Sequence, residues 1–251
     1  SNKSKGLSLD VTWQLGNLEF RSLSAYDDSE FDVFADADGS SVVNTEFTFF
    51  MPFETFTQEF QLLSSGKNDL NWVVGVFYYE ENSSYKFQSL RDQSTFDANG
   101  DGVVDQNDPR FLFTASTDVT STSLGVYGQV DYDLTDRLEL VAGLRYSADE
   151  KEDDQSGIFF ATEGEPLPPP LVPIGLQEED WSEVTGKLGF NYHIDNEVMF
   201  YASYSRGYKA GGFALGQVGG YDPEKVDALE SGLKSRWLDN RLQMNFAAFY
   251  Y

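Results

Sequence analysis

The segment at residues 96–110, which reads FDANGDGVVDQNDPR, has the residue types and spacing of a calcium-binding loop. Calcium prefers oxygen ligands, and an EF-hand loop supplies them from fixed positions around a sharp turn at a glycine. Here Gly102 takes the glycine position. The ligand positions 1, 3, 5, 7, 9 and 12 fall on Asp97, Asn99, Asp101, Val103 (through its backbone carbonyl), Asp105 and Asp108. We therefore predict a structural Ca²⁺ site at residues 97–108.

A second interpretation of this segment stays open. Asp108 stands where a longer glutamate is usual, so it reaches less far toward the ion. The preceding residues 87–96 do not read as a helix, so only the loop of the motif is present. The alternative is a solvated loop rich in Asp, Asn and Gly.

The amino-acid composition excludes several other kinds of functional site. The chain has no cysteine and one histidine, which excludes a disulfide framework, a cysteine nucleophile and a histidine-rich zinc site. No GxSxG elbow accompanies His193, so we expect a structural histidine, no catalytic residues and no enzymatic activity. A net charge of −25 opposes contact with phosphates, which argues against nucleic acid as a partner.

The elements that must carry these residues are strands, because apolar side chains recur with a period of two. In the segment LELVAGLRY at 138–146, one face is apolar and the other is mixed. Each such face continues for about ten residues, the length that a tilted strand needs to cross a bilayer. We count ten strand segments: 6–15, 18–27, 54–64, 70–80, 121–134, 138–149, 181–194, 197–208, 226–238 and 241–251.

The connections between these segments alternate between short and long. The short ones, rich in Gly, Asn and Asp, are expected at 16–17, 65–69, 135–137, 195–196 and 239–240. The long ones are expected at 28–53, 81–120, 150–180 and 209–225. Outer-membrane barrels place short periplasmic turns at one end and long extracellular loops at the other. We therefore predict an all-β, antiparallel, up-and-down transmembrane β-barrel segment.

The charge is distributed in agreement with this polarity. Residues 27–46, 80–118 and 147–183 hold 26 acidic and 4 basic side chains, nearly all of the net charge. The strands are left almost balanced, so they can face lipid on one side and a polar lumen on the other. An acidic mouth of this kind favours neutral or cationic cargo.

Several charged side chains are expected to face the lumen, where they contact cargo or pair across strands. Arg145, Lys187 and Glu230 are our candidates for substrate binding. The same alternation places Asp131, Glu139 and Lys234 on that face.

The last third of the chain resembles a known family. Residues 201–213 read YASYSRGYKAGGF, and Pro223-Glu224 and the run ALESGLKSRWLDNRLQMNFAAFYY follow. These segments resemble the barrel of TonB-dependent outer-membrane receptors, in which a Tyr-Ser-x-Gly-aromatic-Lys run ends a strand and Glu-x-Gly-x-Lys and Asn-x-Ala-x-Phe strands follow. The segments ETFTQEFQL at 54–62 and WVVGVFYYE at 72–80 are also similar to that family.

The resemblance implies a barrel of about 22 strands that is plugged by an N-terminal globular domain. It implies uptake of a scarce nutrient complex, such as a ferric siderophore, energised by the TonB complex through the plug region. Residues 1–251 supply about ten strands and no plug, so we interpret the chain as an internal piece of a longer protein. The expected partners are outer-membrane lipid, a small nutrient complex and TonB, and the expected location is the bacterial outer membrane.

Three alternatives remain at this point. A calcium-stabilised outer-membrane passive pore or surface adhesin would share the strand pattern and the acidic loops. A closed ten-stranded barrel is permitted, because bacterial barrels have even strand numbers. An outer-membrane hydrolase would depend on His193.

Overall fold

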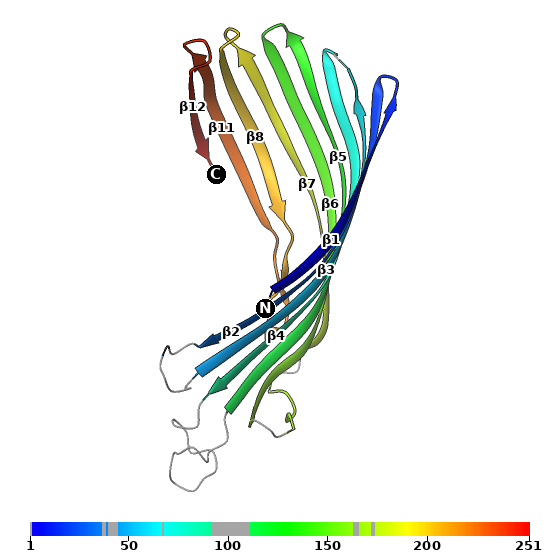
Figure 1. The fold of residues 1–251 in the computed structure, drawn as a ribbon, viewed down its shortest axis with the longest axis vertical. Helices are drawn as coiled ribbons and strands as arrows, with labels where there is room; N and C mark the ends of the chain where they lie inside the picture. Colours follow the sequence, from blue (N-terminus) through cyan, green and yellow to red (C-terminus); the bar gives the residue numbers. More distant parts are fainter. Residues whose placement is uncertain are drawn as a thin grey trace.

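The protein forms one curved antiparallel sheet of 10 strands and a separate two-stranded hairpin (Figure 1). The computed structural model describes residues 2–36, 39, 45–66, 68–91, 111–162, 166–171 and 174–251. The strands of the large sheet are β1 (Asn2–Leu15), β2 (Leu18–Asp36), β3 (Thr45–Ser64), β4 (Leu70–Arg91), β5 (Phe111–Thr135), β6 (Leu138–Thr162), β7 (Gly175–His193), β8 (Val198–Lys209), β11 (Glu224–Trp237) and β12 (Leu242–Tyr250). The hairpin pairs β9 (Gly212–Phe213) with β10 (Gly220–Tyr221).

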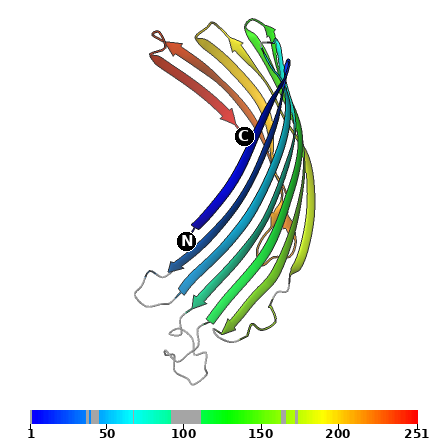
Figure 2. The ribbon, with the colours of Figure 1, turned by 45° about the vertical axis from the view of Figure 1, so that its right-hand side comes forward.

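Neighbours in the large sheet follow the chain order, so the predicted all-β, up-and-down architecture is confirmed. Within the described ranges, no helix is long and apolar enough to cross a membrane. The sheet is an open trough whose edges are β1 and β12 (Figure 2). These two edge strands do not pair in the described part of the chain, so the closed ten-stranded barrel is not formed here.

The short connections lie where the sequence predicts them. Gly16 adopts a φ of 67° in the turn between β1 and β2. Leu238, Asp239 and Asn240 take φ values of 57°, 56° and 66° in the turn between β11 and β12. Glycine, asparagine and aspartate tolerate this left-handed conformation better than other residues. These turns therefore set hairpins at one end of the sheet (Figure 1).

The strands at the other end are longer than predicted, so the expected loop bounds require correction. The predicted loop at 81–120 is strand at both ends, because β4 continues to Arg91 and β5 begins at Phe111. The predicted loop at 150–180 is reduced in the same way by β6 and β7. Beyond the bilayer both faces of a strand meet polar surroundings, so the apolar alternation stops while backbone pairing continues.

Candidate functional site

The cross-strand register defines two faces of the sheet. Tyr127 pairs with Arg145, and Arg145 pairs with Thr185, so these three side chains share a face that we call the lumen face. Leu144 and Leu188 alternate with them and lie on the opposite, outer face, where they are 68% and 64% exposed. A polar inner face opposite an exposed apolar face is the pattern of a membrane barrel. Membrane-spanning segments are here the roughly ten residues next to each short turn.

Arg145 is held on the lumen face by two aromatic rings. Its guanidinium carbon lies 5.6 Å from the ring centroid of Phe77 and 5.8 Å from that of Tyr127. The Arg145 Nε atom donates a hydrogen bond of 3.0 Å to Ser147 Oγ. A Cβ atom on Gly125 would lie 2.2 Å from Arg145 Nη2, so only glycine leaves room for this guanidinium position. Ring faces attract cations, which fixes the charge in place.

Tyr127 has its own set of partners in the neighbouring strands. Its hydroxyl donates a hydrogen bond to Glu59 Oε1 and accepts one of 3.0 Å from Gln61 Nε2. The ring lies over Gly75, where an added Cβ would come within 2.5 Å of it. Side chains from β3, β4, β5 and β6 thus meet in one cluster on the lumen face.

All six charged residues predicted to face the lumen share the face of Arg145 in the register. Two of them accept a hydrogen bond from a neighbouring strand. Asn191 Nδ2 donates a hydrogen bond of 2.6 Å to Glu139 Oε2, and the Tyr201 hydroxyl donates one of 2.6 Å to Glu230 Oε1. The Lys234 ammonium lies 5.2 Å from the Tyr201 ring centroid. Cargo binding by Arg145, Lys187 and Glu230 stays a prediction.

A row of aromatic side chains, which we call the aromatic wall, continues the lumen face beyond the membrane-spanning segments. Ring centroids are separated by 5.0 Å between Phe49 and Phe87, 5.5 Å between Phe87 and Phe113, and 5.1 Å between Phe113 and Phe160. Burial raises the pKa of the Tyr85 phenol above its ordinary value. The aromatic wall comprises Phe47, Phe49, Tyr85, Phe87, Phe113 and Phe160.

Sequence reasoning missed the aromatic wall, because its members lie in segments that were interpreted as loops. A signal is nevertheless present: aromatic residues recur at a spacing of two in FTFF at 47–50 and YKF at 85–87. That spacing places rings on one face of a strand. Pairs of aromatic rings at these distances stabilise each other beyond their buried area.

The connection between β8 and β11, residues 210–223, is bound to side chains of β6 and β7, and we call it the clamped loop. Lys151 Nζ donates a hydrogen bond of 2.9 Å to the Gly211 carbonyl. Gln155 Nε2 donates a hydrogen bond of 3.2 Å to the Ala214 carbonyl, while Gln155 Oε1 accepts one of 2.8 Å from the Gly216 N–H. One glutamine side chain thus satisfies a donor and an acceptor of the loop backbone, as a neighbouring strand would.

A second glutamine repeats this arrangement on β7. Gln177 Nε2 donates a hydrogen bond of 3.2 Å to the Gln217 carbonyl, and Gln177 Oε1 accepts one of 2.6 Å from the Gly219 N–H. Trp181 packs against the start of the loop, since a Cβ on Gly211 would lie 2.7 Å from its ring. The clamped loop contains most of the KAGGF motif at 209–213, so the motif lies where the loop contacts the sheet.

The most deeply buried polar side chain among the described residues lies beneath this loop. Asp153 is 1% exposed, and it accepts hydrogen bonds from Thr117 Oγ1 and, at 2.6 Å, from Gln155 Nε2. Burial lowers the pKa of the nearby Lys151 below its ordinary value. Buried polar groups that are fully hydrogen-bonded fix one arrangement of the chain, which here is the position of the clamped loop.

The predicted calcium ligands Asp97, Asn99, Asp101, Val103, Asp105 and Asp108 lie outside the described residues. In the ranges that are described, no three acidic or histidine side chains are grouped to hold a metal ion. His193 is the last residue of β7, and its backbone N–H donates a hydrogen bond of 2.8 Å to the Arg137 carbonyl.

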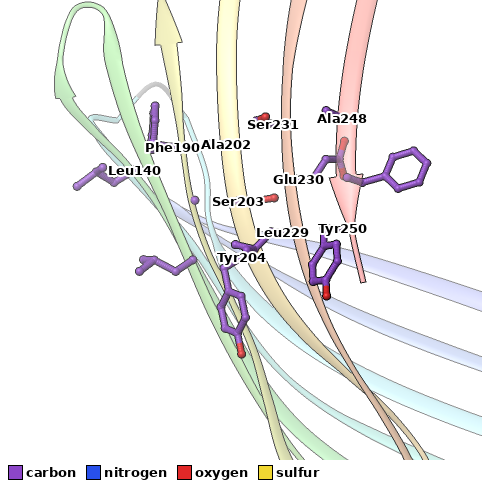
Figure 3. Close-up of a pocket in the computed structure, with 13 residues that line it drawn as sticks. Leu140, Phe190, Ala202, Ser203, Tyr204, Leu229, Glu230, Ser231, Ala248 and Tyr250 are labelled. Carbon is purple, nitrogen blue, oxygen red and sulfur yellow. The ribbon is translucent and has the colours of Figure 1, made fainter.

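The outer face carries an apolar hollow of about 690 Å³ across β7, β8, β11 and β12. Figure 3 shows Phe190, Tyr204, Leu229 and Tyr250 around it, together with the small side chain of Ala202. Leu229 and Tyr250 are 56% and 76% exposed. This surface suits contact with lipid rather than with a polar cargo.

Acidic side chains beyond the membrane-spanning segments of β6 and β7 lie on both faces of the sheet, and those on the lumen face are Asp149, Asp153, Glu179 and Glu183. Glu150 pairs with Asp180, and Glu152 pairs with Glu178, in alternation with the lumen-facing Lys151. All four acidic side chains of these two pairs are exposed. Negative charge therefore lies on both faces of these strands, and the preference for a neutral or cationic cargo stays a prediction.

Comparison with known proteins agrees with this geometry. The family model described as "TonB dependent receptor-like, beta-barrel" matches residues 1–251. Pesticin receptors of Yersinia enterocolitica serotype O:8 and Yersinia pestis are 27% identical over 219 residues, which cover 84% of this chain. The chain spans 28% of the length of these relatives.

Solved structures show the same fold. The ferric yersiniabactin uptake receptor FyuA from Yersinia pestis superposes with a TM-score of 0.70 at 17% identity, over 99% of this chain and 35% of that one. The siderophore receptor PiuA from Acinetobacter baumannii gives a TM-score of 0.66 at 19% identity, over 99% of this chain and 39% of the other. At such identities the likeness concerns the fold alone.

Proposed function

Because the chain belongs to the TonB-dependent receptor-like β-barrel family, we propose that the complete protein is an outer-membrane receptor for a scarce nutrient complex, such as a ferric siderophore. The observation that carries this proposal is the family match over residues 1–251. The names of the relatives support an iron chelate as the cargo class, since FyuA is a ferric yersiniabactin uptake receptor. The family is one of transport receptors rather than enzymes.

The lumen face supports binding of an organic complex. The aromatic wall offers ring surfaces to an apolar or aromatic part of the cargo, and polar groups stand further along the same face. Ligand sites commonly combine an apolar lining with a few polar groups that fix orientation. Transport energy would come from TonB, through a region outside these 251 residues, and lipid would contact the outer face.

The test is uptake by the complete protein in a Gram-negative host that lacks its own siderophore receptors. Cells that express the receptor should accumulate radioactive iron from a panel of ferric siderophores during iron limitation. Deletion of tonB from the host should abolish that accumulation. Uptake that persists without TonB would instead support a passive pore.

We also propose, from the sequence alone, that residues 97–108 bind calcium. Six ligand positions and the turn glycine agree with the EF-hand spacing. Calcium is abundant outside the cell, so a site with a dissociation constant of about 10⁻⁴ M would be mostly occupied there. The ion would have a structural role in the connection between β4 and β5.

A further inference from the structure

The part of β7 that lies beyond the membrane has a neighbouring strand on only one side. β6 pairs with β7 from Tyr192 back to Gly175 without a register shift. β8 pairs with β7 only from His193 to Gly186, and it ends well short of the far end of the sheet (Figure 1). The segment Gly175–Thr185 of β7 is therefore a strand edge, which we call the β7 edge. Because β6 and β8 are both in the described sheet, this edge does not depend on residues outside the chain.

The alternation of the backbone shows which groups of the β7 edge are unpaired. In an antiparallel strand, the N–H and C=O of one residue face one neighbour, and those of the next residue face the other. His193 N–H donates to the Arg137 carbonyl on the β6 side, and Ile194 N–H donates to the Val198 carbonyl on the β8 side. The even-numbered residues of the β7 edge therefore face the open side, and these are Leu176, Glu178, Asp180, Ser182 and Val184.

The open side of the β7 edge is accessible. Among the residues that the structure describes, none makes a backbone hydrogen bond to these even-numbered positions from the β8 side. Their side chains are all exposed, and they lie on the outer face. The clamped loop leaves this side open, because it is bound by Gln177 and Trp181, which alternate with them and lie on the lumen face.

The β7 edge lacks the usual protection of an exposed strand. Sheet edges are commonly blocked by proline, by lysine or by a bulge. Residues 175–185 contain no proline and no lysine, and their ladder with β6 is regular. A regular edge with unpaired N–H and C=O groups can accept an extended peptide as an additional strand.

The charge of the β7 edge selects its occupant. Residues 175–185 contain four acidic side chains and no basic one. Glu178 and Asp180 stand beside Glu152 and Glu150 of β6 on the outer face. A second copy of the chain would bring like charges together at this edge, which opposes pairing. A strand with basic side chains opposite the carboxylates would be attracted instead.

We propose that the β7 edge is a docking site for an extended basic segment of an extracellular protein, which adds to the sheet as a strand beside β7. Backbone hydrogen bonds hold the segment, and its basic side chains meet Glu178 and Asp180 on the outer face. The edge belongs to the end of the sheet with the long connections, which faces the cell exterior in outer-membrane barrels. The proposal goes beyond nutrient uptake, because the ligand is a protein segment.

The probe is a dye-labelled, end-capped peptide of sequence VATAKAKAL, titrated onto the complete, detergent-solubilised receptor and followed by fluorescence anisotropy. In an antiparallel pairing with residues 176–184, its lysines lie opposite Glu178 and Asp180, and its small alanines lie on the side of the clamped loop. We expect its dissociation constant to be at least about tenfold lower than that of VATAEAEAL, since like charges directly opposite each other destabilise a strand pair.

Methylation of the peptide backbone separates strand addition from general attraction between charges. Methyl groups on the amide nitrogens of the threonine and the two lysines would face β7, and they should weaken binding by at least about tenfold through lost hydrogen bonds. The same number of methyl groups on alanine nitrogens would face away from β7 and should change binding little. Equal effects of the two methylation patterns would overturn strand addition.

Receptor variants locate the site. Ser182→Pro removes an N–H from the open side and places a ring there, so it should abolish binding, whereas Ser182→Ala should not. Glu178→Gln combined with Asp180→Asn should remove most of the preference for the lysine peptide. Glu80→Gln combined with Asp118→Asn is the matched control, because it removes the same charge from the outer face of β4 and β5.

The absence of a preference for the lysine peptide in the unaltered receptor would overturn the docking site, and so would binding that Ser182→Pro leaves unchanged. If Ser182→Pro does not fold, the two methylated peptides decide with the unaltered receptor. The siderophore uptake assay uses neither peptide. Loss of uptake with peptide binding intact therefore refutes the receptor function and not the docking site, and the reverse result refutes only the docking site.

Discussion

Tyr127 lies over Gly75 across β4 and β5, and its ring occupies the space that any side chain at residue 75 would need. A Cβ atom there would approach the ring to 2.5 Å, well inside normal contact distance. The same relationship recurs between Tyr201 and Gly232 across β8 and β11, with an approach of 2.6 Å. An aromatic ring that covers a glycine in the next strand shields backbone and fixes register.

Gly75→Ala should therefore destabilise the complete barrel by about 1–3 kcal/mol, the usual cost of overpacking. Gly143→Ala is the matched control, because the nearest atom to its new Cβ lies at 3.5 Å. That control should be neutral or slightly stabilising, since alanine loses less backbone entropy than glycine. Urea titration of the folded, heat-modifiable band on gels measures both. An equal loss in the two variants would contradict the steric explanation.

The clamped loop should loosen when its glutamines are shortened. Gln155→Ala and Gln177→Ala each remove two hydrogen bonds to the loop backbone, which contribute about 0.5–1.5 kcal/mol apiece. We expect faster proteolysis within residues 210–223, with barrel assembly unchanged. Gln129→Ala serves as the control, because the Gln129 side chain donates a hydrogen bond of 3.0 Å to Asp131 and none to the loop. Unchanged cleavage in the double variant would show that the clamps do not hold the loop.

The pKa values of Lys151 and Lys5 should be shifted in opposite directions from that of an ordinary lysine. Burial lowers the pKa of Lys151, whereas hydrogen bonding and attraction to Asp28 raise the pKa of Lys5. The Lys151 contribution to loop stability therefore rises as pH increases through its folded pKa. The Lys5 ion pair is complete below its ordinary pKa and is lost as pH rises through its raised value.

NMR titration of ¹³C-methylated lysines measures this order directly. The Lys151 signal is identified by its disappearance in Lys151→Arg, and the Lys5 signal in the same way. The Lys151 midpoint should lie at lower pH. A Lys151 midpoint equal to or above that of Lys5 would disprove the assignment of Lys151 as a buried cation.

Calcium should protect the connection between β4 and β5. Binding to the ordered form alone adds about 1.4 kcal/mol at a tenfold excess of ion over the dissociation constant. We expect EDTA or Asp101→Ala to increase proteolysis within 81–120 and to leave barrel assembly intact. Asp92→Ala, outside the ligand pattern, is the control. If neither EDTA nor Asp101→Ala changes cleavage, the segment is the solvated loop of the alternative interpretation.

The ten strands and their short turns could be predicted because lipid on one side imposes a period of two, and turn residues mark each hairpin. The outer halves of β5 and β6 could not, since no apolar face distinguishes them from loops. The alternation along 138–146 predicts the lumen-facing position of Arg145. Its contact with Phe77 depends on register across three strands, which a local pattern does not reveal.

The glutamine clamps illustrate a second limit of sequence reasoning. Gln155 binds the backbone of Ala214 and Gly216, about sixty residues further along the chain. Backbone atoms are the same at every position, so such a contact leaves no residue-type signature at the loop. Only the folded sheet shows that these segments meet.

The paired length of β5 and β6 separates two tasks of the chain. Each strand has 25 residues, of which about ten suffice to cross the hydrocarbon layer. The remainder is a paired extension of the sheet beyond the hydrocarbon layer. Insertions and substitutions at its tips can accumulate without disturbing membrane insertion. The membrane-spanning part of the sheet can thus be retained while the segments outside it diverge.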